Sequence, residues 1–400
     1  MVFIHGGGFQ FGSGASPTYE GTKIAKQGVV LVTINYRLGN FGFLALPELD
    51  QEGQSGNFGL QDQIFALKWV RDNINAFGCD PKNVLAFGES AGAHAVGMLM
   101  ASPLAKSAFD KAIIESGSWW DSEHGSLSTH DQAFHIGMEW AGGRPLSQLR
   151  QLPARAVVNS SLWNSNTDPT LTAFSPSVDG YVLKAAPAAV FKAGTQLKVP
   201  LIAGWNRLEE ILFLGRELPY NTPELFQAGL NQLFGVAPAL YPAGDQSQTN
   251  GSSNALTGDL IIREQTWEAG NLHALAKNSV YEYYYTYSSA YSPVPAHTAE
   301  LPFVFGTLTN GGLTATTPKA TDADRAFAAQ VVSYWVTFAK TGIPNGGGLP
   351  QWPQYNSGGQ VNQLGNSIGA TSYDFARFRF IQGYRGRNGR LLASWRTMNA

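Results

Sequence analysis

Two serines lie in the pattern Gly-x-Ser-x-Gly, in which a serine can act as the nucleophile of an acyl-transfer reaction. They are Ser90, in VLAFGESAGAHAVGML, and Ser367, in LGNSIGA. The pattern alone is weak evidence, because the 400-residue chain contains 45 glycines. Such a nucleophile needs a strand before it, a sharp turn at the serine and a helix after it. The residues around each serine therefore decide between the two.

Only Ser90 has the required surroundings. The apolar run 84–87 precedes it, and the helix-forming run AGAHAVGMLM follows it. Gly88 and Gly92 leave room for the neighbouring strand and helix, and the free N–H groups at a helix N-terminus favour a developing oxyanion. Ser367 follows NSGGQVNQL and precedes GATSYDF, where we expect neither a strand nor a helix. We interpret Ser367 as a chance match in a loop.

The stretch HGGGF near the start of the chain could supply donors for that oxyanion. It ends the predicted strand 2–4, and its three glycines let backbone N–H groups approach a substrate oxygen closely. We expect the N–H groups of Gly7, Gly8 and Ala91 to form an oxyanion hole, and His5 to order the turn. A simple glycine turn is the alternative.

The elements that must position these residues alternate along the chain. The stretch QDQIFALKWVRDNINAFG repeats Ile64, Leu67, Val70, Ile74 and Phe77 at helical spacing, so we predict an amphipathic helix. The first five predicted strands are almost continuously apolar, which is typical of a parallel sheet buried on both faces. Strands alternating with helices predict a doubly wound, mostly parallel α/β sheet. The six predicted strands are residues 2–4, 29–36, 84–87, 111–114, 199–204 and 280–287.

Composition restricts the partners of this chain. Charged residues make up 14% of it and the net charge is -2, so we expect neither nucleic acid nor an anionic membrane surface as a partner. No apolar run is long enough to span a bilayer. The single cysteine, Cys79, allows no internal disulfide and is expected to be a small buried residue. The seven histidines have no H-E-x-x-H spacing, and we expect no metal and no cofactor.

We expect residues 1–400 to form a single domain. Two stretches are rich in Gly, Ser, Asn and Pro, namely residues 244–254 and 342–360. We predict that both are surface loops inside this domain rather than linkers between two domains.

Several segments of the chain resemble the type-B carboxylesterases, the cholinesterase-like branch of the α/β-hydrolases. NYRLGNFGFL and FGESAGA are specific to that family, whereas HGGG also occurs in other esterases. The resemblance extends through YWVTFAKTGIPN and WPQY, covers most of the chain, and implies an α/β-hydrolase fold. The main segments are HGGGFQFGSG, VVLVTINYRLGNFGFL, GNFGLQDQIFALKWVRDNINAFG, DPKNVLAFGESAGA and SPSVDGYVL.

In this family a glutamate and then a histidine follow the catalytic serine along the chain. VPLIAGWNRLEEILF is similar to the family pattern G-x-N-x-x-E, which implies Glu209 as the acid. Family members usually carry glycine after the acid, whereas this chain has Glu210, so that residue and Asp179 stay open as alternatives. HTAELPFVFG is similar to the family's histidine segment and implies His297 as the base.

The resemblance implies a serine carboxylesterase that cleaves short- to medium-chain or aryl esters without a cofactor. Its acyl-enzyme would form on Ser90, with His297 transferring the proton and Glu209 orienting the imidazole. A lipase of the same family, or an inactive binding module of this fold, are the alternatives. The inactive module is disfavoured because all three catalytic residues are present.

Residues that contact the substrate are harder to predict. Phe9, Trp119 and Trp205 lie near the ends of predicted strands and could line an aromatic pocket, but each could equally belong to the core. Glu89 stands at the position where the family usually has a carboxylate, and we expect it to shape the electric field near Ser90.

The resemblance also implies that this chain lacks the N-terminal strands of the family. Strand 29–36 would then form an uncovered apolar edge, which favours association. We expect either a partial gene product or a shortened form that covers this edge as a homodimer. Acyl-chain preference and cellular compartment stay open.

Overall fold

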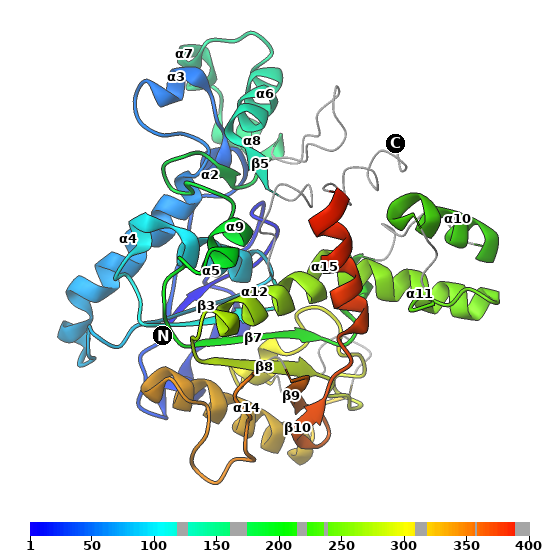
Figure 1. Ribbon diagram of the computed structural model, residues 1–400. Coiled ribbons are helices and arrows are strands. Elements are labelled where there is room, and N and C mark those ends of the chain that lie inside the picture. The colour runs from blue at the N-terminus through cyan, green and yellow to red at the C-terminus, as the bar shows by residue number, and fades with distance from the viewer. Residues whose placement is uncertain are drawn as a thin grey trace.

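An eight-stranded sheet runs through the computed structural model, which describes residues 1–117, 127–160, 174–213, 222–235, 239–308, 318–356 and 358–388 (Figure 1). Neighbouring strands follow the order β10-β9-β8-β7-β4-β3-β1-β2. All neighbours pair in parallel except β9 and β10, which form an antiparallel hairpin. The strands are β1 (Val2–Ile4), β2 (Val32–Thr33), β3 (Leu85–Glu89), β4 (Lys111–Glu115), β7 (Leu201–Asn206), β8 (Val280–Tyr285), β9 (Gln360–Leu364) and β10 (Ile368–Ser372).

Successive residues of the central strands face two different apolar layers. In β4, Ala112 and Ile114 join the layer that contains helices α4, α5, α9 and α12, whereas Ile113 joins the layer that contains α13 and α14. Figure 1 shows α5 and α12 on one face of the sheet and α14 on the other. A sheet buried on both faces requires the continuous apolar strands seen in the sequence. This arrangement confirms the predicted doubly wound, mostly parallel α/β fold.

The helices outside these two layers form further groups. Helices α2, α3 and α6 to α8 gather above one end of the sheet, together with the two-stranded sheet of β5 (Ser128–Thr129) and β6 (Ser177–Val178) (Figure 1). Helices α10, α11 and α15 share a third apolar cluster. The helices are α1 (Thr22–Ala25), α2 (Gly39–Phe43), α3 (Pro47–Asp50), α4 (Phe58–Asn73), α5 (Ala91–Ala101), α6 (His130–Ala141), α7 (Leu146–Leu149), α8 (Ala154–Asn159), α9 (Pro187–Lys192), α10 (Pro223–Phe234), α11 (Gln246–Gly258), α12 (Glu264–Leu275), α13 (Leu301–Val304), α14 (Asp322–Thr341) and α15 (Ala376–Asn388).

Single-turn helical segments complete the described structure. One of them, Asp259–Arg263, is π-helical and joins α11 to α12 without a break. The 3₁₀ segments are Pro17–Tyr19, Ile74–Phe77, Pro103–Ala105 and Glu209–Phe213.

Two local predictions were wrong. The stretch 244–254 is not a loop, because α11 occupies most of it. The Asp245 side chain caps that helix by accepting from the N–H of Gln248 at 2.8 Å. Three hydroxyls of this helix, on Thr249, Ser252 and Thr257, donate to backbone carbonyls, as in the 2.9 Å bond from Thr257 Oγ1 to the carbonyl of Ser253. Ser367 follows a strand after all, but it lies exposed in the β9–β10 turn and no helix follows it directly.

Other elements differ in extent rather than in kind. Only Val32–Thr33 of the predicted strand 29–36 pairs with β1, and it is the last strand at that side of the described sheet. Phe77 is 62% exposed, although the other four apolar residues of its helical pattern are buried. Cys79 is partly rather than fully buried.

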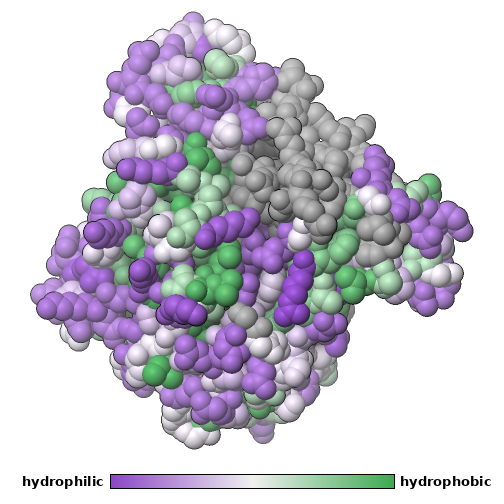
Figure 2. Space-filling view, in the orientation of Figure 1, coloured by the Kyte–Doolittle hydropathy of each residue, from purple (hydrophilic) through white to green (hydrophobic). Residues whose placement is uncertain are grey.

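Hydrophilic residues cover most of the face in Figure 2, and apolar residues form smaller groups between them. None of the helices in the described ranges combines the length and the apolar character that a bilayer-spanning helix needs.

Candidate active site

The predicted catalytic segments follow the carboxyl ends of strands that are close together in the sheet. The HGGG turn follows β1, Ser90 follows β3, and Glu209 comes three residues after β7. His297 lies in the loop after β8. Because the carboxyl ends of parallel strands meet at one edge of a sheet, this topology gathers the four segments in the place where α/β proteins bind ligands.

Ser90 stands at a strained turn between β3 and α5. Its φ is +54° and its ψ is -123°, which a residue with a side chain rarely adopts. Its N–H donates to the carbonyl of Glu115 at 3.0 Å. A Cβ on Gly92 would lie 1.9 Å from the carbonyl oxygen of Ile4, so only glycine lets α5 begin this close to β1. This is the strand–turn–helix geometry that the sequence predicts for a nucleophile.

The HGGG turn packs directly against this serine. A Cβ on Gly6 would lie 3.0 Å from the Cβ of Ser90. Gly7 and Gly8 have φ values of +109° and +61°, and among the described residues a Cβ on Gly8 would meet no atom within 4 Å. Within the described residues, the N–H groups of Gly7, Gly8 and Ala91 donate to no protein acceptor. All three are therefore available to a substrate oxygen.

His5 stabilises the HGGG turn from behind. Its Nδ1 lies 2.8 Å from the carbonyl oxygen of Gly6, and its ring stacks on Tyr36 at a centroid distance of 4.7 Å. The Tyr36 hydroxyl donates to the carbonyl of His5 at 2.9 Å. Burial lowers the pKa of His5, which keeps it neutral. His5 is thus placed to order the turn, as expected.

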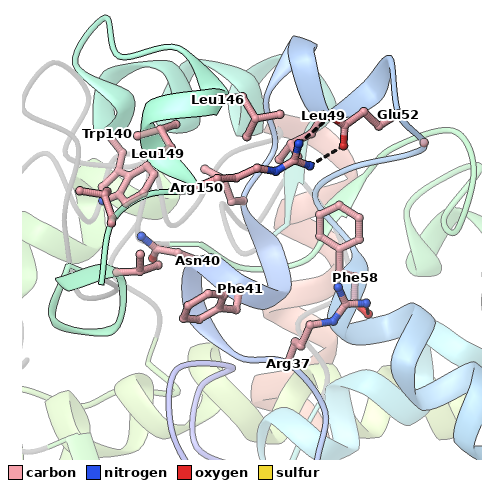
Figure 3. A pocket seen from close by; sticks show the side chains of 14 residues that line it. Arg37, Asn40, Phe41, Leu49, Glu52, Phe58, Trp140, Leu146, Leu149 and Arg150 are labelled. Atoms are coloured by element: carbon pink, nitrogen blue, oxygen red, sulfur yellow. Dashed lines mark hydrogen bonds and ion pairs between the residues drawn. The ribbon is translucent and has the colours of Figure 1, made fainter. Parts of the chain in front are cut away.

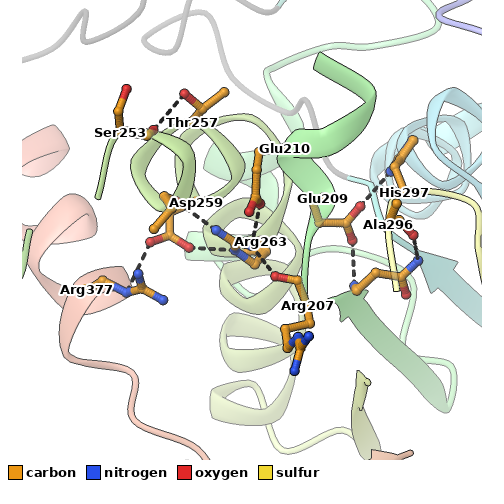
Figure 4. Close-up of polar contacts among 12 residues, drawn as sticks. Arg207, Glu209, Glu210, Ser253, Thr257, Asp259, Arg263, Ala296, His297 and Arg377 are labelled. Atoms are coloured by element: carbon orange, nitrogen blue, oxygen red, sulfur yellow. Dashed lines mark hydrogen bonds and ion pairs between the residues drawn. The ribbon is translucent and has the colours of Figure 1, made fainter. Parts of the chain in front are cut away.

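Glu209, rather than Glu210, contacts the histidine (Figure 4). One oxygen of Glu209 lies 2.6 Å from Nδ1 of His297, and the other accepts from the N–H of Asn206 at 2.6 Å. Glu210 turns the other way and pairs with Arg263 at 2.9 Å. The third acid that stayed open, Asp179, accepts from the N–H groups of Tyr181 and Leu183 and so stabilises its own turn.

The second ring nitrogen of His297 faces Glu89, the residue before the serine. Nε2 of His297 lies 3.2 Å from Oε1 of Glu89, and both side chains are buried. Burial lowers the pKa of His297, but the carboxylates of Glu89 and Glu209 outweigh it and raise the pKa to about 9. Burial also raises the pKa of Glu89 to about 8, an effect that His297 opposes. His297 thus connects the acid loop to the end of β3 that carries Ser90.

Sequence reasoning assigned no role to the two residues that hold the His297 loop in place, Asn206 and Glu300. The Asn206 side chain donates to the carbonyl of Ala296 at 2.7 Å and also to the carboxylate of Glu300. Burial, together with the charge of Glu209, raises the pKa of Glu300 to about 7. Asn206 is the asparagine of the family pattern G-x-N-x-x-E, and Glu300 is the glutamate three residues after His297 in the family's histidine segment. These two patterns were the signal that could have identified them.

Glu115 is a further buried carboxylate near this site. It ends β4 and accepts from the indole N–H of Trp335 at 2.8 Å. Burial raises the pKa of Glu115 well above its ordinary value. The sequence did not single out Glu115, because the predicted strand 111–114 ended one residue before it.

The predicted aromatic pocket residues need correction. Trp205 is fully buried and packs edge-on against Tyr373 and Phe378, at centroid distances of 5.3 and 5.7 Å, so it is a core residue. Phe9 is also fully buried, with Phe43 at 5.2 Å, and supports the turn rather than facing a ligand. Trp119 lies outside the described residues.

A cavity of about 510 Å³ lies among α2, α3 and α6 to α8 (Figure 3). Its walls include Phe41, Leu49 and Trp140, and Arg150 pairs with Glu52 beside it at 2.8 Å. None of the predicted catalytic residues lines this cavity, so we do not assign it to the reaction. In the described ranges, no three His, Cys, Asp or Glu side chains are grouped so that they could hold a metal ion.

Comparisons with known proteins agree with the geometry. The sequence model that describes the carboxylesterase family matches residues 1–376 of this chain. The chain is 34% identical to the fumonisin B1 esterase of Sphingopyxis macrogoltabida, over 92% of this chain and 70% of that protein. It is 36% identical to the para-nitrobenzyl esterase of Bacillus subtilis, over 89% of this chain and 73% of that protein.

Solved structures show the same relationship. A PNB esterase structure superimposes with a TM-score of 0.80 at 31% identity, over 96% of this chain and 79% of that chain. The Geobacillus stearothermophilus carboxylesterase EST55 also has a TM-score of 0.80, at 32% identity, over 94% of this chain and 81% of that chain. The chain therefore belongs to the carboxylesterase family, a family of carboxylic ester hydrolases with the α/β-hydrolase fold.

Proposed function

We propose that this chain cleaves carboxylic esters through an acyl-enzyme on Ser90, with His297 as the general base and Glu209 as the acid that orients it. The observation that carries the proposal is the 2.6 Å contact between Glu209 and Nδ1 of His297, beside a serine at a strained strand–helix turn. A carboxylate on Nδ1 fixes the tautomer whose Nε2 can accept a proton.

Acylation follows from this arrangement. Neutral His297 takes the hydroxyl proton of Ser90 through Nε2 while Oγ attacks the carbonyl carbon of the ester. The carbonyl oxygen becomes an oxyanion, and the N–H groups of Gly7, Gly8 and Ala91 stabilise it. When the tetrahedral intermediate collapses, the C–O bond to the alcohol breaks and His297 returns the proton to the leaving oxygen.

Deacylation repeats the same steps with water. His297 removes a proton from the water as its oxygen attacks the acyl carbon, and Ser90 leaves with that proton. The products are a carboxylic acid and an alcohol, so atoms and charge balance without a cofactor.

We further propose that the substrates are short- to medium-chain or aryl esters. Two relatives named as esterases, the para-nitrobenzyl esterase and the fumonisin B1 esterase, support ester hydrolysis, and the name of the first supports esters with an aromatic group. p-Nitrophenyl acetate, butyrate and decanoate therefore form a suitable test series.

The experiment compares the purified wild type with Ser90→Ala and with the matched control Ser367→Ala on these three esters. We expect Ser90→Ala to lower kcat by about 10⁴-fold or more, because nothing else can form the acyl-enzyme. Ser367→Ala should leave all three rates unchanged, because Ser367 lies exposed in a hairpin turn. Activity that survives in Ser90→Ala would refute the mechanism. A rate that rises sharply only above the solubility limit of decanoate would instead identify a lipase.

A further inference from the structure

A buried ion network adjoins the short turn that carries Glu209 (Figure 4). Its centre is Arg263, whose side chain is 3% exposed and which ends the π-helical segment between α11 and α12. Segments of this kind are rare and occur frequently at functional sites. The Arg263 guanidinium donates to four groups: the carboxylates of Glu210 at 2.9 Å and Asp259 at 2.7 Å, and the carbonyl oxygens of Arg207 at 2.6 Å and Ala255 at 2.7 Å.

Two of these four contacts hold residues on either side of the catalytic acid. Arg207 precedes Glu209 by two residues and Glu210 follows it directly, and the same nitrogen of Arg263, Nη1, donates to both. The turn is therefore pinned before and after Glu209. Figure 4 shows the two adjacent carboxylates facing opposite sides of the turn, with Glu210 toward Arg263 and Glu209 toward His297. Arg263 therefore contacts one of the two adjacent carboxylates and His297 contacts the other.

The surroundings of Arg263 leave it little freedom. Asp259 also accepts from the hydroxyl of Tyr241 at 2.9 Å and lies 3.3 Å from Nε of Arg377. A Cβ on Gly258 would lie 2.6 Å from Oε2 of Glu210 and 2.7 Å from Nη2 of Arg263, so a larger residue there would displace this ion pair. A planar guanidinium with four directed contacts is a preorganised support, which a flexible ammonium cannot reproduce.

We propose that Arg263 is a positioning residue for the reaction: by clamping Arg207 and Glu210 it holds Glu209 against His297. This inference rests on the proposed Ser90 mechanism. Loss of the clamp lets the turn relax and lengthens the contact between Glu209 and His297. The imidazolium of the transition state then loses support. We expect substrate binding to be unaffected, because the hydrogen bonds that Arg263 makes to described residues include none to Ser90, to His297 or to the HGGG turn.

The test uses Glu210→Ala, which removes the acceptor but leaves Arg263 paired with Asp259. We expect kcat to fall about tenfold with an unchanged KM, since small misplacements remote from the chemistry have effects of this order. The acid limb of kcat/KM should move to lower pH, because Glu209 contributes to the raised pKa of His297. A global loss of structure would lower the amount of active protein without moving this limb.

Three further variants complete the design. Glu210→Gln keeps an oxygen acceptor for Arg263 and should recover most of kcat. Arg263→Lys keeps the charge but cannot reach all four acceptors, so its kcat should resemble that of Glu210→Ala. Arg377→Gln is the matched control, because Arg377 contacts Asp259 in the same network but not the acid turn. Its kcat and pH profile should match the wild type.

All rates are expressed per reactive serine, counted by titration with a fluorophosphonate. If the wild type is active but Glu210→Ala shows an unchanged kcat and an unmoved acid limb, this result would overturn the positioning role of Arg263 but not the proposed Ser90 mechanism. A wild type without a titratable serine would overturn the proposed mechanism, and the clamp with it.

Discussion

Glu89 lies where it can control when the catalytic base is available. Its carboxylate is 3.2 Å from Nε2 of His297, the nitrogen that accepts the proton of Ser90 in the proposed mechanism. After the opposing effect of burial, Glu89 is the largest contribution to the pKa of His297, which reaches about 9. Only neutral His297 can act as a base, so kcat/KM should rise with pH through this pKa. Glu89→Gln removes the charge while it preserves the size of the side chain.

The size of the effect follows from the distance. Two unit charges 3.2 Å apart interact by about 5 kcal/mol at an effective dielectric constant of about 20. This value is an upper bound, because burial raises the pKa of Glu89 itself to about 8 and the carboxylate is only partly charged near neutral pH. An adjacent opposite charge usually shifts a pKa by about 1–3 units. We therefore expect the acid limb of Glu89→Gln to move down by about one pH unit, at the lower end of that range.

The same charge also acts on the transition state. His297 becomes an imidazolium there, and without Glu89 that cation is less stable by a similar amount. One pKa unit corresponds to about 1.4 kcal/mol, or tenfold in rate. The plateau of kcat/KM at high pH should therefore fall by up to about tenfold, while the rates of the two enzymes converge at low pH. At low pH His297 is already charged in the ground state, so the loss of Glu89 destabilises both states alike.

The assay is a pH profile of kcat/KM for p-nitrophenyl butyrate, normalised per reactive serine. Glu115→Gln is the matched control, because Glu115 is also buried nearby but contacts Trp335 rather than the histidine. Its limb and plateau should equal those of the wild type. An unmoved limb in Glu89→Gln, or a limb that moves to higher pH, would refute this account of the electrostatics.

Two further substitutions test the core and the turn. Trp205→Ala should lower the free energy of unfolding by about 3–5 kcal/mol in denaturant melts, because it empties a fully buried site, and KM should stay constant in the folded fraction. Gly92→Ala should abolish fluorophosphonate titration at Ser90, because its Cβ would lie 1.9 Å from the carbonyl oxygen of Ile4. Gly97→Ala, in the same helix, meets its nearest atom only at 3.9 Å, so it should retain full titration.

Local steric rules explain why the strained turn at Ser90 and the HGGG turn were predictable. Position 92 requires glycine because α5 begins against the end of β1, and this glycine is part of the Gly-x-Ser-x-Gly motif. Six of the eight strands of the central sheet were predicted, five of them as apolar runs, because a sheet buried on both faces allows little else. The hairpin of β9 and β10 was not predicted.

The errors came from contacts remote in sequence or from polar helices. Trp205 was ambiguous because the predicted strand ended at residue 204, whereas β7 continues to Asn206 and directs the indole into the core. The orientation of Glu210 depends on Arg263, which is 53 residues away. Helix α11 was mistaken for a loop because polar residues and glycine make up its first nine residues. A capping aspartate, hydroxyl–backbone bonds and the apolar cluster that it shares with α10 and α15 stabilise it.

The central claim is that Ser90 is the nucleophile. The most direct measurement is to treat the purified chain with a fluorophosphonate ester and to locate the label by peptide mass spectrometry. The account predicts one label per chain, on the peptide that contains Ser90. No label on a folded chain, or a label on Ser367, would contradict it.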